Sequence, residues 1–186
     1  MRALLVLAVA VSAAVAPTSA APAVPSTGSS AQARAMLELQ VLRELNRVRA
    51  ARGVARLRTV KGLRASAAEH SRAMLAIGFF AHTSADGTAF HERIRRHYTD
   101  RGWDTWSVAE TLLFSTGETD AKSVVAAWLE SPPHRRIIMS PGWEDAGIAA
   151  LYRPAAPGYF EGADAMVVTA DFGYRAGKFP RSRALP

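Results

Sequence analysis

The 186-residue sequence contains no cysteine. Disulfide bonds and cysteine-ligated zinc sites are therefore excluded, and the folded state must be stabilised by buried apolar surface. A domain of about 150 residues buries roughly 70% of the surface that its unfolded chain exposes, which is sufficient without cross-links. The sequence also lacks an internal repeat, so we expect one ordinary globular domain.

Long hydrophobic runs are lacking beyond the start of the chain. Arg2 precedes an apolar run over residues 3–15, and residues 17–20 read Pro-Thr-Ser-Ala. A membrane-spanning helix needs about 20 apolar residues, whereas a short apolar run between a positive residue and small residues is typical of a cleaved signal peptide. We therefore expect a signal peptide over residues 1–20, a flexible leader over residues 21–34, and a secreted mature protein without a membrane span. A retained signal anchor is the alternative.

Acidic residues are few: 16 Asp and Glu stand against 23 Lys and Arg, which gives a formal net charge of +7. The basic residues are spread along expected helices and a basic tail (residues 175–186), without an aromatic-interleaved patch, so specific nucleic-acid binding is not expected. A soluble arginine-rich surface explains the charge, and weak, salt-sensitive association with an envelope polyanion is the alternative. We expect a monomer.

Apolar residues recur at helical spacing in the first two thirds of the chain. The predicted helices cover residues 37–48, residues 60–77, a short stretch after residue 88, and residues 120–129. Gly53 and Gly78 are expected to end the first two. His70 falls on the apolar side of the second helix, where a core histidine with a local partner is the expected role. The charged residues of the short helix, Arg93 among them, are assigned mostly to solvated faces and given no function.

The last third of the chain has a different pattern. Residues 146–152 and 165–172 are short β-compatible runs, and the Pro/Gly-rich residues 153–164 join them as a hairpin loop. The stretch with Trp103 and Trp106 is expected to be irregular up to Glu110. Helices followed by a small sheet indicate an α+β class.

Two prolines interrupt the helical pattern in Ser131-Pro132-Pro133-His134. Proline fixes φ and has no amide proton, so one helix must stop near Ser131 and another can begin there. His134 then lies in the first turn of the new helix.

Several short motifs follow one another along the chain. They are Leu45-Asn46-Arg47-Val48-Arg49, Ala68 to Met74, Phe80-Ala81-His82, Ala109-Glu110, Trp128 to Arg135, Gly147-Ile148 and Asp171-Phe172-Gly173. In their order and spacing the chain resembles the CAP superfamily, also called SCP-like, which contains the cysteine-rich secretory proteins, antigen 5 and the pathogenesis-related 1 proteins. The resemblance covers residues 37–173 and is closest to the cysteine-free bacterial type.

The resemblance implies a three-layer α-β-α sandwich with a small central antiparallel sheet, here over residues 35–174. It also implies a cleft lined by His82, Glu110 and His134. The chain departs from the family at two points: Thr111 stands where the family has an asparagine after the acid, and only Glu130 is available as a second acid.

Two imidazoles and a carboxylate suit Zn²⁺ or another divalent cation with an open coordination position. A hydrogen-bonded network of the same three residues is the simpler interpretation. We expect a non-enzymatic binding module for a small apolar or cell-envelope-derived ligand, and we assign no catalytic residue. A metal-assisted hydrolase or protease that uses the same residues is the alternative, and a serine nucleophile, Ser84 or Ser131 with Asp171 as orienter, is disfavoured because no Gly-x-Ser-x-Gly motif is present.

Overall fold

The computed structural model describes residues 27–178, and the expected signal peptide lies outside these residues. The elements in chain order are α1 (Thr27–Ala50), β1 (Arg58–Thr59), α2 (Lys61–Ile77), α3 (Phe90–His97), β2 (Trp103–Ser115), α4 (Ala121–Glu130), α5 (Pro132–Met139), β3 (Asp145–Arg153), the 3-10 helix η1 (Gly158–Phe160) and β4 (Ala165–Lys178). Across residues 27–178, no helix combines the length and apolar character needed to span a bilayer.

The strands form one sheet in the order β1-β3-β4-β2. The predicted hairpin is confirmed, because β3 and β4 pair antiparallel along their length. Strand β2 pairs antiparallel with the other side of β4, and the short β1 adds a parallel edge to β3. The sheet is therefore antiparallel except at β1.

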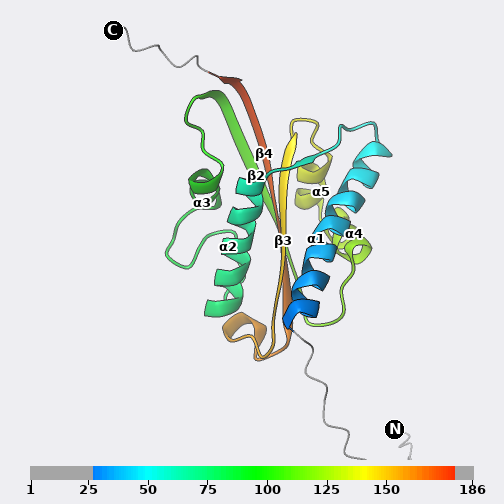
Figure 1. The fold of residues 1–186 in the computed structure, drawn as a ribbon, viewed down its shortest axis with the longest axis vertical. Coiled ribbons are helices and arrows are strands. Elements are labelled where there is room, and N and C mark those ends of the chain that lie inside the picture. Colours follow the sequence, from blue (N-terminus) through cyan, green and yellow to red (C-terminus); the bar gives the residue numbers. More distant parts are fainter. Residues whose placement is uncertain (1–26, 179–186) are drawn as a thin grey trace, which may run out of the picture.

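Helices cover both faces of the sheet (Figure 1): α2 and α3 lie on one side, and α1, α4 and α5 on the other. Strand β2 shows the alternation that this arrangement requires. Leu112 packs into the cluster beneath α2, whereas Ala109 and Leu113 pack into the cluster with α1 and α4. The predicted three-layer α+β sandwich is confirmed, and apolar residues of the strands fill both interfaces.

Three boundaries differ from the sequence predictions. Helix α1 begins at Thr27, inside the segment expected to be a flexible leader. Strand β4 continues to Lys178, so the first residues of the expected loose tail are paired with β2. Residues 103–115 form a strand where an irregular stretch was expected. The first half of β2 carries exposed polar residues such as Asp104 and Ser107, which conceal its strand pattern, and pairing with β4 orders it.

Helix α2 approaches the sheet closely at Gly147 on β3. A Cβ atom at this position would lie 2.0 Å from the backbone nitrogen of Arg64. Only a residue without a side chain allows this contact. The helix ends as predicted at Gly78, which has a left-handed backbone (φ 87°). The close packing places the polar side chains of α2 directly over the central strands.

Candidate functional site

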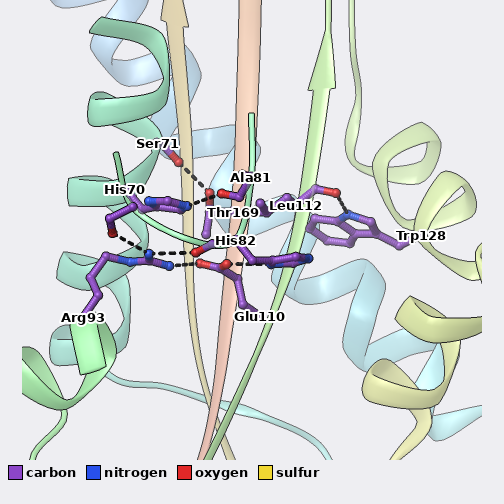
Figure 2. Close-up of polar contacts among 10 residues, drawn as sticks. His70, Ser71, Ala81, His82, Arg93, Glu110, Leu112, Trp128 and Thr169 are labelled. Carbon is purple, nitrogen blue, oxygen red and sulfur yellow. Dashed lines mark hydrogen bonds and ion pairs between the residues drawn. The ribbon is translucent and has the colours of Figure 1, made fainter. Parts of the chain in front are cut away.

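Glu110 lies on β2 and faces the layer that contains α2 and α3. Its side chain is only 1% exposed. A carboxylate at this depth needs hydrogen-bond donors to compensate for lost hydration. Two come from segments that flank the strand, the loop after α2 and helix α3 (Figure 2).

His82, in the loop between α2 and α3, binds Glu110 directly. Its Nδ1 lies 2.8 Å from Oε1 of Glu110. Because the carboxylate only accepts hydrogen bonds, Nδ1 carries a proton, and in the neutral imidazole Nε2 therefore has the lone pair. The His82 side chain is 49% exposed. A buried acid therefore holds an exposed imidazole in a defined orientation and tautomer.

Arg93 on α3 supplies the second donor to Glu110. Its side chain is 2% exposed, and its guanidinium binds Oε2 of Glu110 while also donating to the carbonyl of His82 and to Oγ of Ser84, both at 3.1 Å. Its assignment to a solvated face was wrong for this residue. The spacing from Phe90, one turn earlier on α3, is the signal that could have placed Arg93 on the buried side. Arg93 joins the acid to the loop that carries the imidazole.

His70 anchors the same loop from α2. It is 1% exposed, and its Nε2 donates to the carbonyl of Ala81 at 2.8 Å. Burial lowers the pKa of His70, so the imidazole is neutral at neutral pH. The predicted role of a core histidine with a local partner is confirmed.

His134 lies in the first turn of α5, as the two prolines predict, with Ser131 at the N-cap position. It is partly buried, and burial together with the charge of His82 lowers the pKa of His134. In the part of the chain that the structure describes, no hydrogen bond or ion pair joins His134 to His82 or Glu110. Glu130 ends α4 as an exposed residue, and within residues 27–178 no hydrogen bond or ion pair joins it to this site. The structure gives no support to Glu130 as the second acid.

The predicted three-residue metal site finds little support in this geometry. Within the described residues, no group of three His, Asp or Glu side chains is arranged to hold an ion. Both oxygens of Glu110 already accept hydrogen bonds, from His82 and Arg93. As placed, Glu110 fits an orienting role for His82 better than a ligand role, and metal binding stays a prediction.

Asp171 is a further buried acid of the site. Asp171 on β4 lies opposite Glu110 in the strand register and is fully buried. Burial first, and then the charge of Glu110, raise the pKa of Asp171 well above the usual range. Thr111 is also buried, but strand alternation turns it toward the opposite face, so the departure from the family asparagine does not alter the His82–Glu110 contact.

An apolar hollow of about 370 Å³ lies on the other face of the sheet. It is lined by Leu37 and Gln40 of α1 together with Tyr152 and Met166.

Aromatic side chains lie on the face of the sheet that carries His82. Phe90 packs edge-on against the imidazole at 6.4 Å between ring centroids, and Phe80 stacks on Tyr159 at 5.7 Å. Tyr159 is 54% exposed. Phe90 therefore provides apolar surface next to His82, and Phe80 and Tyr159 belong to a second aromatic group.

Comparison with known proteins identifies related folds. The sequence profile of the cysteine-rich secretory protein (CAP) family matches residues 42–161. An outer surface protein from Borrelia burgdorferi aligns with a TM-score of 0.57 and 22% identity, over 73% of this chain and 90% of that protein. An extracellular SCP-domain protein from Bacillus anthracis aligns with a TM-score of 0.61 and 18% identity, over 82% of this chain and 44% of that one. A cysteine-rich secretory protein from Staphylococcus aureus aligns with a TM-score of 0.53 and 13% identity, over 75% and 38%.

The chain thus spans less than half the length of the Bacillus and Staphylococcus proteins. No curated protein matched the sequence. At these identities the structural likeness concerns the fold.

Proposed function

Because this chain belongs to the CAP (cysteine-rich secretory protein) family, we propose that it is an exported binding module for a small cell-envelope-derived ligand. The single observation that carries the proposal is the contact of 2.8 Å between the exposed His82 imidazole and the buried Glu110 carboxylate. Such a pair presents a fixed hydrogen-bonding atom, Nε2 of His82, to an incoming polar group. We include His134, in the first turn of α5, as a second imidazole of the proposed site.

The apolar part of the ligand would contact the rings beside His82. Phe90 packs edge-on against the imidazole, whereas Phe80 and the exposed Tyr159 form a second aromatic group together with Phe114. A few fixed polar groups next to aromatic side chains are typical of small-molecule sites. This arrangement supports a ligand with a polar group and a small apolar body.

Export is part of the proposal. It is supported by the sequence of residues 1–20, which lie outside the described part of the chain, and by the extracellular and outer-surface proteins that share the fold. An envelope ligand is the class that an exported protein of this kind meets. Weak attraction of the basic surface to envelope polyanions would increase the rate at which the protein meets the envelope, and this effect would not depend on His82.

A hydrolase that uses the same residues is the second candidate. The observation that favours it is the acid-imidazole pair itself, because a buried carboxylate that orients an imidazole is also how general bases are held. Oγ of Ser84, one of the two candidate nucleophiles, accepts a hydrogen bond from Arg93 at 3.1 Å. Within residues 27–178, no hydrogen bond joins a hydroxyl group to the His82 imidazole, and binding is the function that we rank first.

Native mass spectrometry after incubation with a lipid extract of bacterial envelopes tests the proposal. The wild type should retain small molecules that the double variant His82→Ala/His134→Ala does not retain. His91→Ala is the matched control, because His91 is an exposed histidine on α3. Equal retention by all three proteins would refute the binding site. A chelator-sensitive hydrolytic activity that is lost in the double variant would instead establish the second candidate.

A further inference from the structure

Asp171 and Glu110 are cross-strand neighbours on adjacent strands. The register pairs Asp171 with Glu110 of β2 on one side and with Gly147 of β3 on the other. Directly paired residues of an antiparallel sheet project from the same face, so the two carboxyl groups lie side by side beneath α2. Asp171 is completely buried, and the Glu110 side chain is 1% exposed.

The two acids share a single buried arginine. Arg93 binds Glu110, and its charge also acts on Asp171. The other polar neighbour of Asp171 is the hydroxyl of Ser66 on α2, while β3 contributes only Gly147. Within the described residues, neither oxygen of Asp171 has a hydrogen-bond partner, and the Ser66 hydroxyl is likewise unpaired. The site thus holds one positive charge for two carboxyl groups at a depth where an unpaired charge is costly.

We propose that Asp171 is held as the neutral acid and donates its proton to Glu110, so that the site contains two acids with one negative charge. A carboxylate offers about four acceptor positions, so Glu110 can accept from Asp171 in addition to His82 and Arg93. The hydrogen bonds then run without a break from Asp171 through Glu110 to the exposed imidazole of His82. Asp171 touches no ligand and acts through Glu110, which makes it a positioning residue.

Asp145 provides a matched comparison on the same face of the sheet. It is also buried, at 6% exposure, but Arg58 binds its Oδ1 at 2.9 Å and the hydroxyl of Tyr98 donates to its Oδ2 at 2.8 Å. Asp145 therefore has a cation of its own, whereas Asp171 shares Arg93 with Glu110.

Infrared spectroscopy of protein labelled with ¹³C-aspartate tests the proposal, because a protonated carboxyl has a C=O stretch well separated from the carboxylate bands. At pH 7 the wild type and Asp145→Asn should show one isotope-shifted protonated-aspartate band, and Asp171→Asn should show none. A wild type without this band, or a band that persists in Asp171→Asn, would overturn the proposal. The wild-type spectrum decides the question even if a variant fails to fold.

The positioning role of Asp171 in ligand binding rests on the proposed function. The protonation state does not, because the spectrum is recorded without ligand. Asp171→Asn keeps an N–H donor for Glu110, so its retention of envelope lipids should stay within twofold of the wild type. Asp171→Ala removes the donor and should reduce retention at least fivefold. Equal retention by the two variants would refute the positioning role. Failure of the binding proposal would leave the infrared result unchanged.

Discussion

His82 and Glu110 occupy opposite ends of the burial scale although they are joined by a 2.8 Å hydrogen bond. The imidazole is 49% exposed and the carboxylate is 1% exposed. The buried Glu110 therefore fixes the orientation of the exposed His82. Variants without this hydrogen bond should lose the fixed orientation of the imidazole.

Arg93→Leu should destabilise the protein by about 3–5 kcal/mol, because it leaves the carboxylate of Glu110 buried without its cation. Urea unfolding followed by circular dichroism measures the change. Arg96→Leu is the control: Arg96 is exposed on the same helix and makes one long hydrogen bond, at 3.4 Å to Thr88, so about 0.5 kcal/mol or less is expected. Equal losses in both variants would show that Arg93 is not paired as described.

Replacement of His70 should change the pH dependence of stability. Burial lowers the pKa of His70 below 6.5 in the folded state, so on acidification the unfolded chain takes up the proton first. This contribution to stability is complete above pH 6.5 and is lost as the pH falls toward the folded-state pKa, with a slope of at most about 1.4 kcal/mol per pH unit. Urea unfolding at intervals of about one pH unit between pH 5 and 8 measures this dependence. Below pH 6.5 the free energy of unfolding of His70→Gln should fall less steeply with decreasing pH than that of the wild type. His134 remains in both proteins, so an unchanged slope would contradict the neutral buried state of His70.

Gly147→Ala should be among the most damaging small substitutions. Its Cβ would lie 2.0 Å from the backbone nitrogen of Arg64, and backbone atoms of α2 cannot move away without unpacking the helix. We expect a loss of about 3 kcal/mol or more, measured as the free energy of unfolding. Gly142→Ala, where the added atom would meet only Oγ of Ser140 at 3.5 Å, should stay within about 1 kcal/mol. Similar losses at both glycines would argue against the close approach of α2.

Arg49→Lys should disturb the helix that carries His134. Arg49 is fully buried on α1 and donates to the carbonyls of Ile138 and Ser140 at the end of α5, at 2.6 and 2.9 Å. Lysine cannot reproduce the planar fork of donors, so a loss of about 2–4 kcal/mol is expected. Arg47→Lys, two residues earlier in an exposed pair with Glu44, should cost less than about 1 kcal/mol. Thermal unfolding of the two variants compares them, and an Arg49→Lys protein as stable as Arg47→Lys would contradict this anchoring role.

Local sequence pattern was sufficient to predict the helices, and the resemblance to a known family implied the layer arrangement. Helical periodicity places α2 with its end at Gly78, and the two prolines before His134 predict the break between α4 and α5. These features depend on residues close together in the chain. The order of motifs also selected His82 and Glu110, which the structure brings into contact.

Features that depend on distant partners were not predicted. Strand β2 lacks a continuous apolar pattern in its first half and is ordered by pairing with β4. Arg93 lies in a helix with charged residues on most sides: its spacing from Phe90 indicates the buried side, but its partner Glu110 lies 17 positions later in the chain. Asp171 stood out only as an orienter for a serine nucleophile, because its proximity to Glu110 arises from strand register.

The tautomer of His82 tests the central claim most directly. Two-dimensional ¹⁵N NMR of the imidazole at pH 8 distinguishes a proton on Nδ1 from one on Nε2. We predict the Nδ1–H form in the wild type, because the buried carboxylate of Glu110 can only accept, and its loss in Glu110→Ala. A wild-type His82 with its proton on Nε2, or the same Nδ1–H form in both proteins, would contradict the orientation of His82 by Glu110.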